Sequence, residues 1–174
     1  MELIKEIAIR RSVRNFINKE VENEKIELII EAGMLAPSAK NEQPWEFIVI
    51  KNNELLVKLS QVSPFAKPCL NCNCAIVPVL DENRVIVNDK GYAIQDMSLC
   101  IENMMLQAVN LELGSVYLGI YPNKERVEKL SNLLNIDSKT KKIPFSIICL
   151  GYPTSTNQNK YISRKDPIRI KYID

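Results

Sequence analysis

The stretch "FSIICLGYP", residues 145–153, is an almost uninterrupted apolar run. Aromatic and β-branched residues followed by glycine and proline are typical of a strand and its end. A strand that is apolar along both of its faces has to be covered on both sides. We therefore expect a central strand of a sheet that carries helices on its two faces.

Three further stretches predict strands around it, WEFIVIK (45–51), CAIVPVL (74–80) and SVYLGI (115–120). Pro78 lies inside the second of them, where the missing N–H indicates an edge strand or a bulge. The chain ends on IRIKYI (168–173), which alternates as a strand does but has no evident partner. An unpaired terminal strand commonly pairs with a second subunit, so this stretch indicates a dimer.

Apolar residues at helical spacing predict helices between the strands. The expected ranges are 2–10, 23–37, 53–60, 91–112 and a helix that follows Asn123. Asn23 and Asn123 are suitable N-caps, and Gly114 is well placed to end the long fourth helix. The broad apolar face of that helix fits either a core helix or a subunit interface. Together, these strands and helices predict a single α+β domain, residues 1–174, with an extended polar C-terminal arm over 154–174.

Composition limits the class of protein. Lys and Arg total 23 against 21 Asp and Glu, a net charge of +2, which is too balanced for a surface that binds nucleic acid or anionic lipid. No run reaches the ~18 apolar residues of a membrane span, and the N-terminus does not resemble a signal peptide. We therefore expect a cytoplasmic protein with neither a nucleic-acid nor a membrane partner.

The chain has no histidine. This excludes Ser-His and Cys-His catalytic pairs and removes the commonest general base. If the protein is an enzyme, we expect a bound group, and no catalytic side chain, to supply its reactive chemistry.

Positive charge is concentrated near the N-terminus, in IRRSVRNF (9–16). Arg10, Arg11 and Arg14 lie where a helix gives way to extended chain. Guanidinium groups there suit phosphate oxygens, with Ser12 as a neutral donor. Taken alone, the cluster is more simply interpreted as a solvated helix end.

A second segment, APSAKNEQPWEF (36–47), joins the end of a helix to a buried strand. Its small residues allow a ligand to approach the backbone, and Ser38 and Asn41 supply hydrogen-bonding groups. The simpler interpretation is an ordinary loop with Trp45 as a core anchor.

In combination, RRSVRNF, APSAKNEQPW, YLGI after a long helix and LGYP at a strand end resemble the nitroreductase family of FMN-dependent oxidoreductases. The resemblance covers essentially the whole chain and implies a central, mainly antiparallel sheet flanked by helices. It also implies a homodimer in which the C-terminal strand is exchanged between subunits. Two FMN sites would lie at the subunit interface, each built from both chains.

At the phosphate end of the cofactor the resemblance implies a set of arginines. Arg10 and Arg11 would bind the FMN phosphate and ribityl chain, with support from Ser12. Arg164, in the closing stretch SRKDPIRIKY, would also bind the phosphate.

At the ring, the resemblance implies that Arg14 faces the pyrimidine edge, where a cation stabilises the negative charge of reduced flavin. Backbone N–H groups at Leu118 and Gly119 would lie beside the nitrogen that carries the hydride. The partner subunit would contribute four loop residues, Pro37, Ser38, Ala39 and Asn41.

The implied activity is a ping-pong reaction. NADH or NADPH would reduce FMN by hydride transfer, and a small electron-poor acceptor such as a nitroaromatic or a quinone would then take the electrons. Two alternatives stay open. One is a specialised flavoenzyme of this fold that cleaves flavin, removes halogen from aromatic rings or oxidises heterocycles; the other is a non-enzymatic flavin-binding protein.

Five cysteines, three of them in CLNCNC (69–74), raise the question of a metal site. An odd number without an export signal indicates thiols rather than a disulfide framework. Cys69, Cys72 and Cys74 do not form a standard full ligand set. Incidental small residues are the favoured interpretation and no metal is expected, with reactive thiols as an alternative.

Overall fold

Strand β5 (Ser146–Gly151) lies in the middle of a five-stranded sheet, with β2 on one side and β3 on the other. The protein is described by a computed structural model over residues 3–85, 90–155, 161 and 163–173. Within these ranges every strand pairing is antiparallel, in the order β1-β2-β5-β3, and β4 pairs with β2. The other strands are β1 (Trp45–Ile50), β2 (Cys74–Asp81), β3 (Gly114–Gly119) and β4 (Lys142–Pro144). The predicted α+β fold with a mainly antiparallel sheet is confirmed.

The two central strands are buried along their whole length. Every residue of β5 and of β2 is buried, and for β5 the apolar run at 145–153 predicts this. Of the two alternatives predicted from Pro78, the edge strand is wrong, because β2 has partners on both sides, whereas the register of the neighbouring ladder shifts by one residue between Ile76 and Val79, as at a bulge. Pro78 lies where the partner changes from β5 to β4, and there it needs no N–H of its own. Its carbonyl accepts the Phe145 N–H at 2.8 Å.

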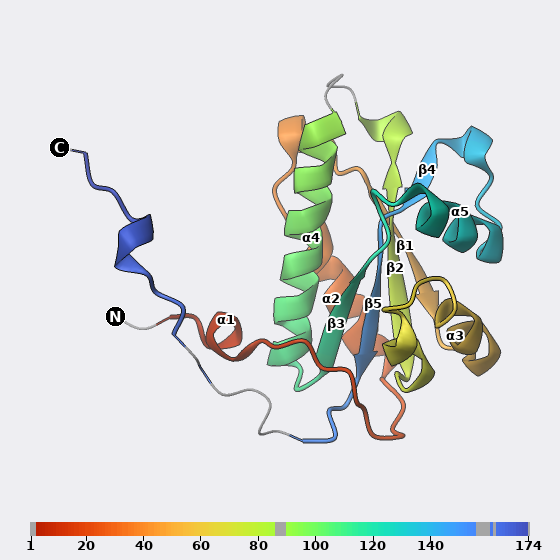
Figure 1. Ribbon diagram of the computed structural model, residues 1–174, viewed down its shortest axis with the longest axis horizontal. Coiled ribbons are helices and arrows are strands. Elements are labelled where there is room, and N and C mark those ends of the chain that lie inside the picture. Colours follow the sequence, from red (N-terminus) through yellow and green to blue (C-terminus); the bar gives the residue numbers. More distant parts are fainter. Residues whose placement is uncertain (1–2, 86–89, 156–160, 162, 174) are drawn as a thin grey trace.

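Helices cover both faces of the sheet (Figure 1). On one face α2 and α4 bury a core with the inward residues of β2 and β5, whereas α3 and α5 bury a second core on the other. The α-helices are α1 (Lys5–Ile9), α2 (Asn23–Met34), α3 (Asn53–Leu59), α4 (Lys90–Asn110) and α5 (Lys124–Leu133). Short 3-10 turns are η1 (Ala39–Asn41), η2 (Lys67–Leu70), η3 (Glu82–Arg84), η4 (Ser138–Thr140) and η6 (Pro167–Arg169). Among the helices described, none is long and apolar enough to cross a membrane.

The long helix α4 is a core helix along its methionine-bearing side. Met97, Met104 and Met105 are buried, and a Cβ added at Gly33 of α2 would lie 2.7 Å from the Met104 Cγ. Glycine therefore allows α2 and α4 to approach closely. Leu99 and Tyr92 of the same helix remain exposed, so one side of α4 also leaves an apolar surface uncovered in the single chain.

Local sequence signals predict some of the helix boundaries correctly and miss others. The Asn123 side chain caps α5 by accepting the Arg126 N–H at 3.0 Å, as predicted. The cap of α2 is Glu22 rather than Asn23, and α2 ends at Met34, three residues before Pro37. The first helix is also shorter than predicted, since it runs from Lys5 to Ile9, and none of its residues is buried.

Gly114 does not end the long helix. The residue that adopts the left-handed conformation after α4 is Glu112, with φ of 62°, and Gly114 is the first residue of β3. The absence of a side chain at Gly114 instead allows a close packing contact. A Cβ at Gly114 would lie 2.7 Å from the Val13 Cγ1, so glycine admits the segment that follows α1 against β3.

The predicted strand over 168–173 is wrong for the single chain. Its beginning forms the 3-10 turn η6, and the residues after it form no regular structure. The arm extends away from the sheet (Figure 1) and Ile168 is 95% exposed. A strand requires a partner ladder, and the described residues of this arm pair with no strand of their own chain. Exchange of the arm between subunits, and the assignment of 1–174 to a single domain, stay predictions.

Candidate cofactor site

A cationic pocket lies between the end of α1 and the C-terminal arm. Arg10, Arg11, Arg164 and Lys165 line it together with Ser163, and its volume is about 750 Å³. The sequence motifs at 9–16 and 163–172 thus meet in space although they lie at opposite ends of the chain. Of the charged residues that line it, four are cations and one, Glu102, is an anion. This balance favours an anionic ligand.

The two N-terminal arginines are held in place by α1 and α4. The Arg10 Nε lies 3.3 Å from the Glu102 Oε1 of α4, and the backbone N–H of Arg10 caps α1 by donating to the Glu6 carbonyl. The Arg11 Nη1 donates to the Arg10 carbonyl at 2.6 Å and to the Ala8 carbonyl at 3.2 Å. A guanidinium presents five N–H donors in a fixed fork, a geometry that suits the oxygens of a phosphate or a carboxylate.

The segment after these arginines runs along the outer edge of β3. Ser12 forms a parallel bridge with Ser115, and the Val13 N–H donates to the Ser115 carbonyl at 2.8 Å. The Ser12 and Arg14 side chains are exposed and do not line the cationic pocket. Arg14 is oriented by a long hydrogen bond of 3.4 Å from its Nη1 to the Ser12 carbonyl.

Beyond Ser115, the edge of β3 that faces away from β5 pairs with no other strand in the described part of the chain, and we call it the free edge. Hydrogen-bonding groups of an antiparallel strand alternate between its two sides. Since Ser115 faces the 12–13 segment, Tyr117 and Gly119 also direct their N–H and C=O groups away from β5. The Leu118 side chain is buried in the core, and its backbone groups face Ile147. Of the two predicted residues, Gly119 is therefore the one whose backbone N–H faces the free edge, while its carbonyl accepts the Arg126 Nη1 at 3.1 Å.

The loop after α2 is clamped by a buried acid that sequence reasoning missed. Both carboxylate oxygens of Asp96, on α4, accept the Ala39 N–H, at 3.1 and 3.2 Å. The Ser38 Oγ accepts the Gln43 N–H at 3.0 Å. Lys40, Asn41 and Gln43 all have positive φ, between 48° and 58°, a conformation that non-glycine residues seldom adopt. Burial raises the pKa of the Asp96 carboxyl above its usual value.

The two groups of predicted residues do not meet within one chain. Glu102 holds Arg10, and Asp96 holds Ala39; on α4 these two acids are six residues apart, about 9 Å along the axis and roughly 120° around it. The arginine pocket and the loop containing Pro37, Ser38 and Asn41 consequently attach to different sides of the helix. A ligand that touches both would need one of them from a second chain.

The cysteines lie inside the cores. All five are free and buried, and the Cys69 and Cys149 Sγ atoms are 3.5 Å apart. In the part of the chain that the structure describes, no group of three His, Cys, Asp or Glu side chains is arranged to hold a metal. Burial raises the pKa of Cys74 and Cys100 to about 12. The pKa of Cys72 is lowered, because the Cys149 thiol hydrogen bonds to it.

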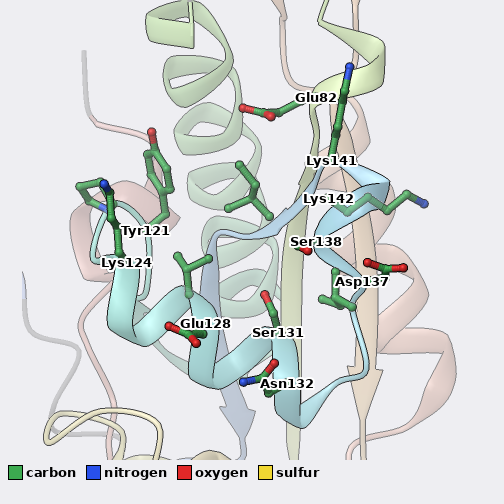
Figure 2. A pocket seen from close by; sticks show the side chains of 14 residues that line it. Glu82, Tyr121, Lys124, Glu128, Ser131, Asn132, Asp137, Ser138, Lys141 and Lys142 are labelled. Atoms are coloured by element: carbon green, nitrogen blue, oxygen red, sulfur yellow. The ribbon is translucent and has the colours of Figure 1, made fainter.

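A second cavity of about 750 Å³ lies between α5 and β4 and contains none of the predicted residues (Figure 2). Its labelled lining carries charges of both signs, among them Lys124, Glu128, Asp137 and Lys141. Lys142 at its rim is paired with Glu46 at 2.7 Å. This mixed lining has no excess charge that would select a phosphate.

An antiparallel sheet between two helical layers, with a cationic pocket at the edge, defines an α+β protein suited to a phosphorylated ligand. Comparison with known proteins makes the assignment specific. A sequence model described as the nitroreductase family matches residues 7–66 and 75–152. The chain belongs to the nitroreductase family.

Individual relatives cover nearly the whole chain. A protein of Methanothermobacter thermautotrophicus, provisionally named NADH dehydrogenase/NAD(P)H nitroreductase, is 36% identical over 98% of this chain and 87% of its own. A crystal structure from Clostridium acetobutylicum, provisionally named an NADH oxidase, is 43% identical with a TM-score of 0.90, over 95% and 97% of the two chains. A provisionally named nitroreductase from Desulfovibrio desulfuricans, solved with FMN, is 26% identical with a TM-score of 0.81, over 100% and 98%.

Proposed function

We propose that this chain is an FMN-dependent oxidoreductase that oxidises NADH or NADPH and reduces small electron-poor acceptors such as nitroaromatics or quinones. The observation that carries the proposal is the convergence of Arg10, Arg11 and Arg164 on one pocket. A structure of a relative with FMN bound supports the choice of ligand.

The pocket fits the phosphate end of FMN. The phosphate would accept hydrogen bonds from Arg10 and Arg164, while Arg11 and Ser12 would hold the ribityl chain. Charge-assisted bonds of this kind are the stronger class of hydrogen bond, and guanidinium forks match phosphate oxygens. Glu102 keeps the Arg10 side chain extended toward the pocket, which lowers the entropy lost when the phosphate binds.

The free edge of β3 fits the ring end. The Gly119 N–H would donate to the ring nitrogen that carries the hydride, and Arg14 would lie at the pyrimidine edge. Bound FMN supplies the hydride chemistry that the side chains of this histidine-free chain lack. Arg14 would stabilise negative charge on the ring, and the Gly119 N–H would hold the ring in register with an incoming nicotinamide.

Completion of the site requires a homodimer in this proposal. The loop residues Pro37, Ser38, Ala39 and Asn41 would reach the ring bound by the other chain, because within one chain they lie on a different side of α4 from the arginines. Exposed apolar residues support such an interface: Ile4 just before α1, Ile7 on α1, Met34 and Leu35 at the end of α2, and Leu99 on α4. The arm would cross to the partner subunit.

The visible spectrum and the mass of the purified protein test the cofactor and the assembly together. We expect a yellow dimer that releases one FMN per chain on denaturation. A colourless protein that does not take up added FMN would overturn the proposal.

Rapid mixing distinguishes an enzyme from a flavin-binding protein without activity. We expect NADH or NADPH to bleach the bound flavin without oxygen, and a nitroaromatic or a quinone to restore its colour. A flavin that neither nucleotide reduces would favour the non-enzymatic alternative.

A further inference from the structure

An arginine outside the sequence motifs contacts the free edge of β3. The Arg126 Nη1, from the first turns of α5, donates to the Gly119 carbonyl at 3.1 Å. Its guanidinium also lies over the Phe65 ring, with the Cζ atom 5.4 Å from the ring centroid. The side chain is half-buried and is therefore fixed between a backbone carbonyl and an aromatic face.

Within the described residues, no carboxylate forms an ion pair with Arg126, although the charge of the adjacent Glu125 interacts with it. Glu125, the adjacent acid, pairs with Lys129 at 2.8 Å. The Gly119 carbonyl and the Phe65 face are both favourable to a cation, but neither carries a formal charge. A half-buried guanidinium that has no carboxylate in direct contact can still stabilise negative charge on a group that binds beside it.

The geometry of strand β3 determines where the positive charge of Arg126 lies. The N–H and the C=O of one residue lie on the same side of an antiparallel strand. The Arg126 guanidinium, which contacts the Gly119 carbonyl, therefore lies on the same edge as the Gly119 N–H. Because Arg126 holds the carbonyl, it also limits rotation of the residue that presents this N–H.

We propose that Arg126 is a positioning residue for the flavin ring: it fixes Gly119 at the edge of β3 and places a positive charge beside the hydride-carrying end of the ring. This inference rests on the proposed function, since it requires FMN at that edge. A fixed cation there stabilises the electron-rich reduced ring more than the oxidised one, so it raises the midpoint potential. Phe65 contributes by restricting the guanidinium to one orientation.

The test compares flavin-loaded Arg126→Gln and Arg126→Lys with the wild type, using Lys129→Gln as a control that removes one charge from the same helix. FMN stoichiometry, the midpoint potential by equilibration with redox dyes, and the rate of reduction by NADH or NADPH are measured for each. We expect Arg126→Gln to retain FMN, to have a more negative potential and to be reduced roughly tenfold more slowly, the scale of one lost charge-assisted hydrogen bond. We expect Lys129→Gln to match the wild type.

The Lys variant separates charge from positioning. It should keep a potential close to that of the wild type, because the charge remains, but be reduced more slowly, because the contact with Gly119 is lost. If Arg126→Gln does not fold, the rate at which Arg126→Lys is reduced becomes the deciding measurement. A rate equal to that of the wild type overturns the proposal. An unchanged potential in flavin-loaded Arg126→Gln also overturns it, as does an equal shift in Lys129→Gln. A wild type without FMN would instead overturn the proposed function itself.

Discussion

The buried Asp96 carboxylate accepts the Ala39 N–H with both of its oxygens, at 3.1 and 3.2 Å. The contact joins α4 to the loop in which Lys40, Asn41 and Gln43 hold left-handed backbone conformations. Each such residue costs on the order of 1 kcal/mol or more, so the loop needs external anchors. Asp96 and the Ser38 hydroxyl provide them.

The first prediction concerns pH. Burial raises the pKa of Asp96, so between the unfolded value, about 3.9, and the raised folded value, the folded chain binds more protons than the unfolded chain. The contribution of Asp96 to the free energy of unfolding therefore falls as the pH rises through this window. Asp96→Asn lacks this dependence. We expect the difference in stability between the wild type and Asp96→Asn to move in favour of the variant as the pH rises.

Urea unfolding of both proteins between about pH 4 and pH 7 measures this difference. Glu128→Gln, at an exposed position of α5, is the control. Its free energy of unfolding should change with pH in the same way as that of the wild type. Parallel curves for Asp96→Asn and the wild type would contradict the prediction.

The second prediction concerns the arginines. Arg10→Ala and Arg164→Ala should each weaken FMN binding roughly 10- to 100-fold, since a charge-assisted bond contributes on the order of 1.5–3 kcal/mol. Arg14→Ala should mainly lower the flavin potential. Fluorescence titration with FMN measures the affinity, and circular dichroism should show unchanged secondary structure. Arg169→Ala, an exposed residue of the same arm paired with Asp166, should bind FMN normally; full affinity in Arg10→Ala would refute the phosphate assignment.

The third prediction is complementation between subunits. If each FMN site takes Arg10 from one chain and Asn41 from the other, a heterodimer of Arg10→Ala and Asn41→Ala chains contains one intact site and one doubly altered site. We expect it to bind one FMN tightly per dimer, whereas each variant homodimer binds weakly. Separately tagged chains, coexpressed and purified through both tags, allow this to be measured. A heterodimer as weak as its parents would place both residues in the same chain's site.

The fourth prediction concerns packing at Gly114. A Cβ there would lie 2.7 Å from the Val13 Cγ1, so Gly114→Ala should destabilise the protein by about 1–3 kcal/mol through overpacking. In a Val13→Ala background the same substitution should cost somewhat less, because the two methyl groups at 2.7 and 3.0 Å are gone while the Cβ at 2.8 Å remains. Chemical denaturation of the four proteins gives the coupling energy. Equal costs in the two backgrounds would show that the Val13 methyl groups are not the obstacle.

The fifth prediction concerns thiol reactivity. Cys72 lies at the wall of a pocket and has a lowered pKa, whereas Cys74 and Cys100 are buried with a pKa of about 12. Because the thiolate is the reactive form, Cys72 should be alkylated first in the native protein at mildly alkaline pH. Mass spectrometry of the peptides after brief treatment with iodoacetamide identifies the site, and Cys72→Ser should remove the fast phase. Equal labelling of all five thiols would indicate that the protein had unfolded.

The sequence by itself determined the local elements and the family. The apolar run at 145–153 identified the central strand, and Asn123 identified the start of α5. Alternation and helical spacing placed the strands and helices of the sheet region nearly as observed, because these patterns express a short-range match between side-chain period and a buried surface. The order of the motifs at 9–16 and 36–47 identified the nitroreductase family.

Only the tertiary structure decided which distant residues meet. Pro78 in a central strand, Gly114 against Val13, the Asp96 contact with Ala39 and the Arg126 contact with Gly119 each join segments that no local pattern connects. The sequence around an acid within a helix is the same whether its side chain faces solvent or accepts a backbone N–H. The same holds for an arginine that follows an N-cap residue. The order of the strands and the packing of α4 and α5 supply that information, because contacts across a fold depend on the whole topology rather than on the neighbouring sequence.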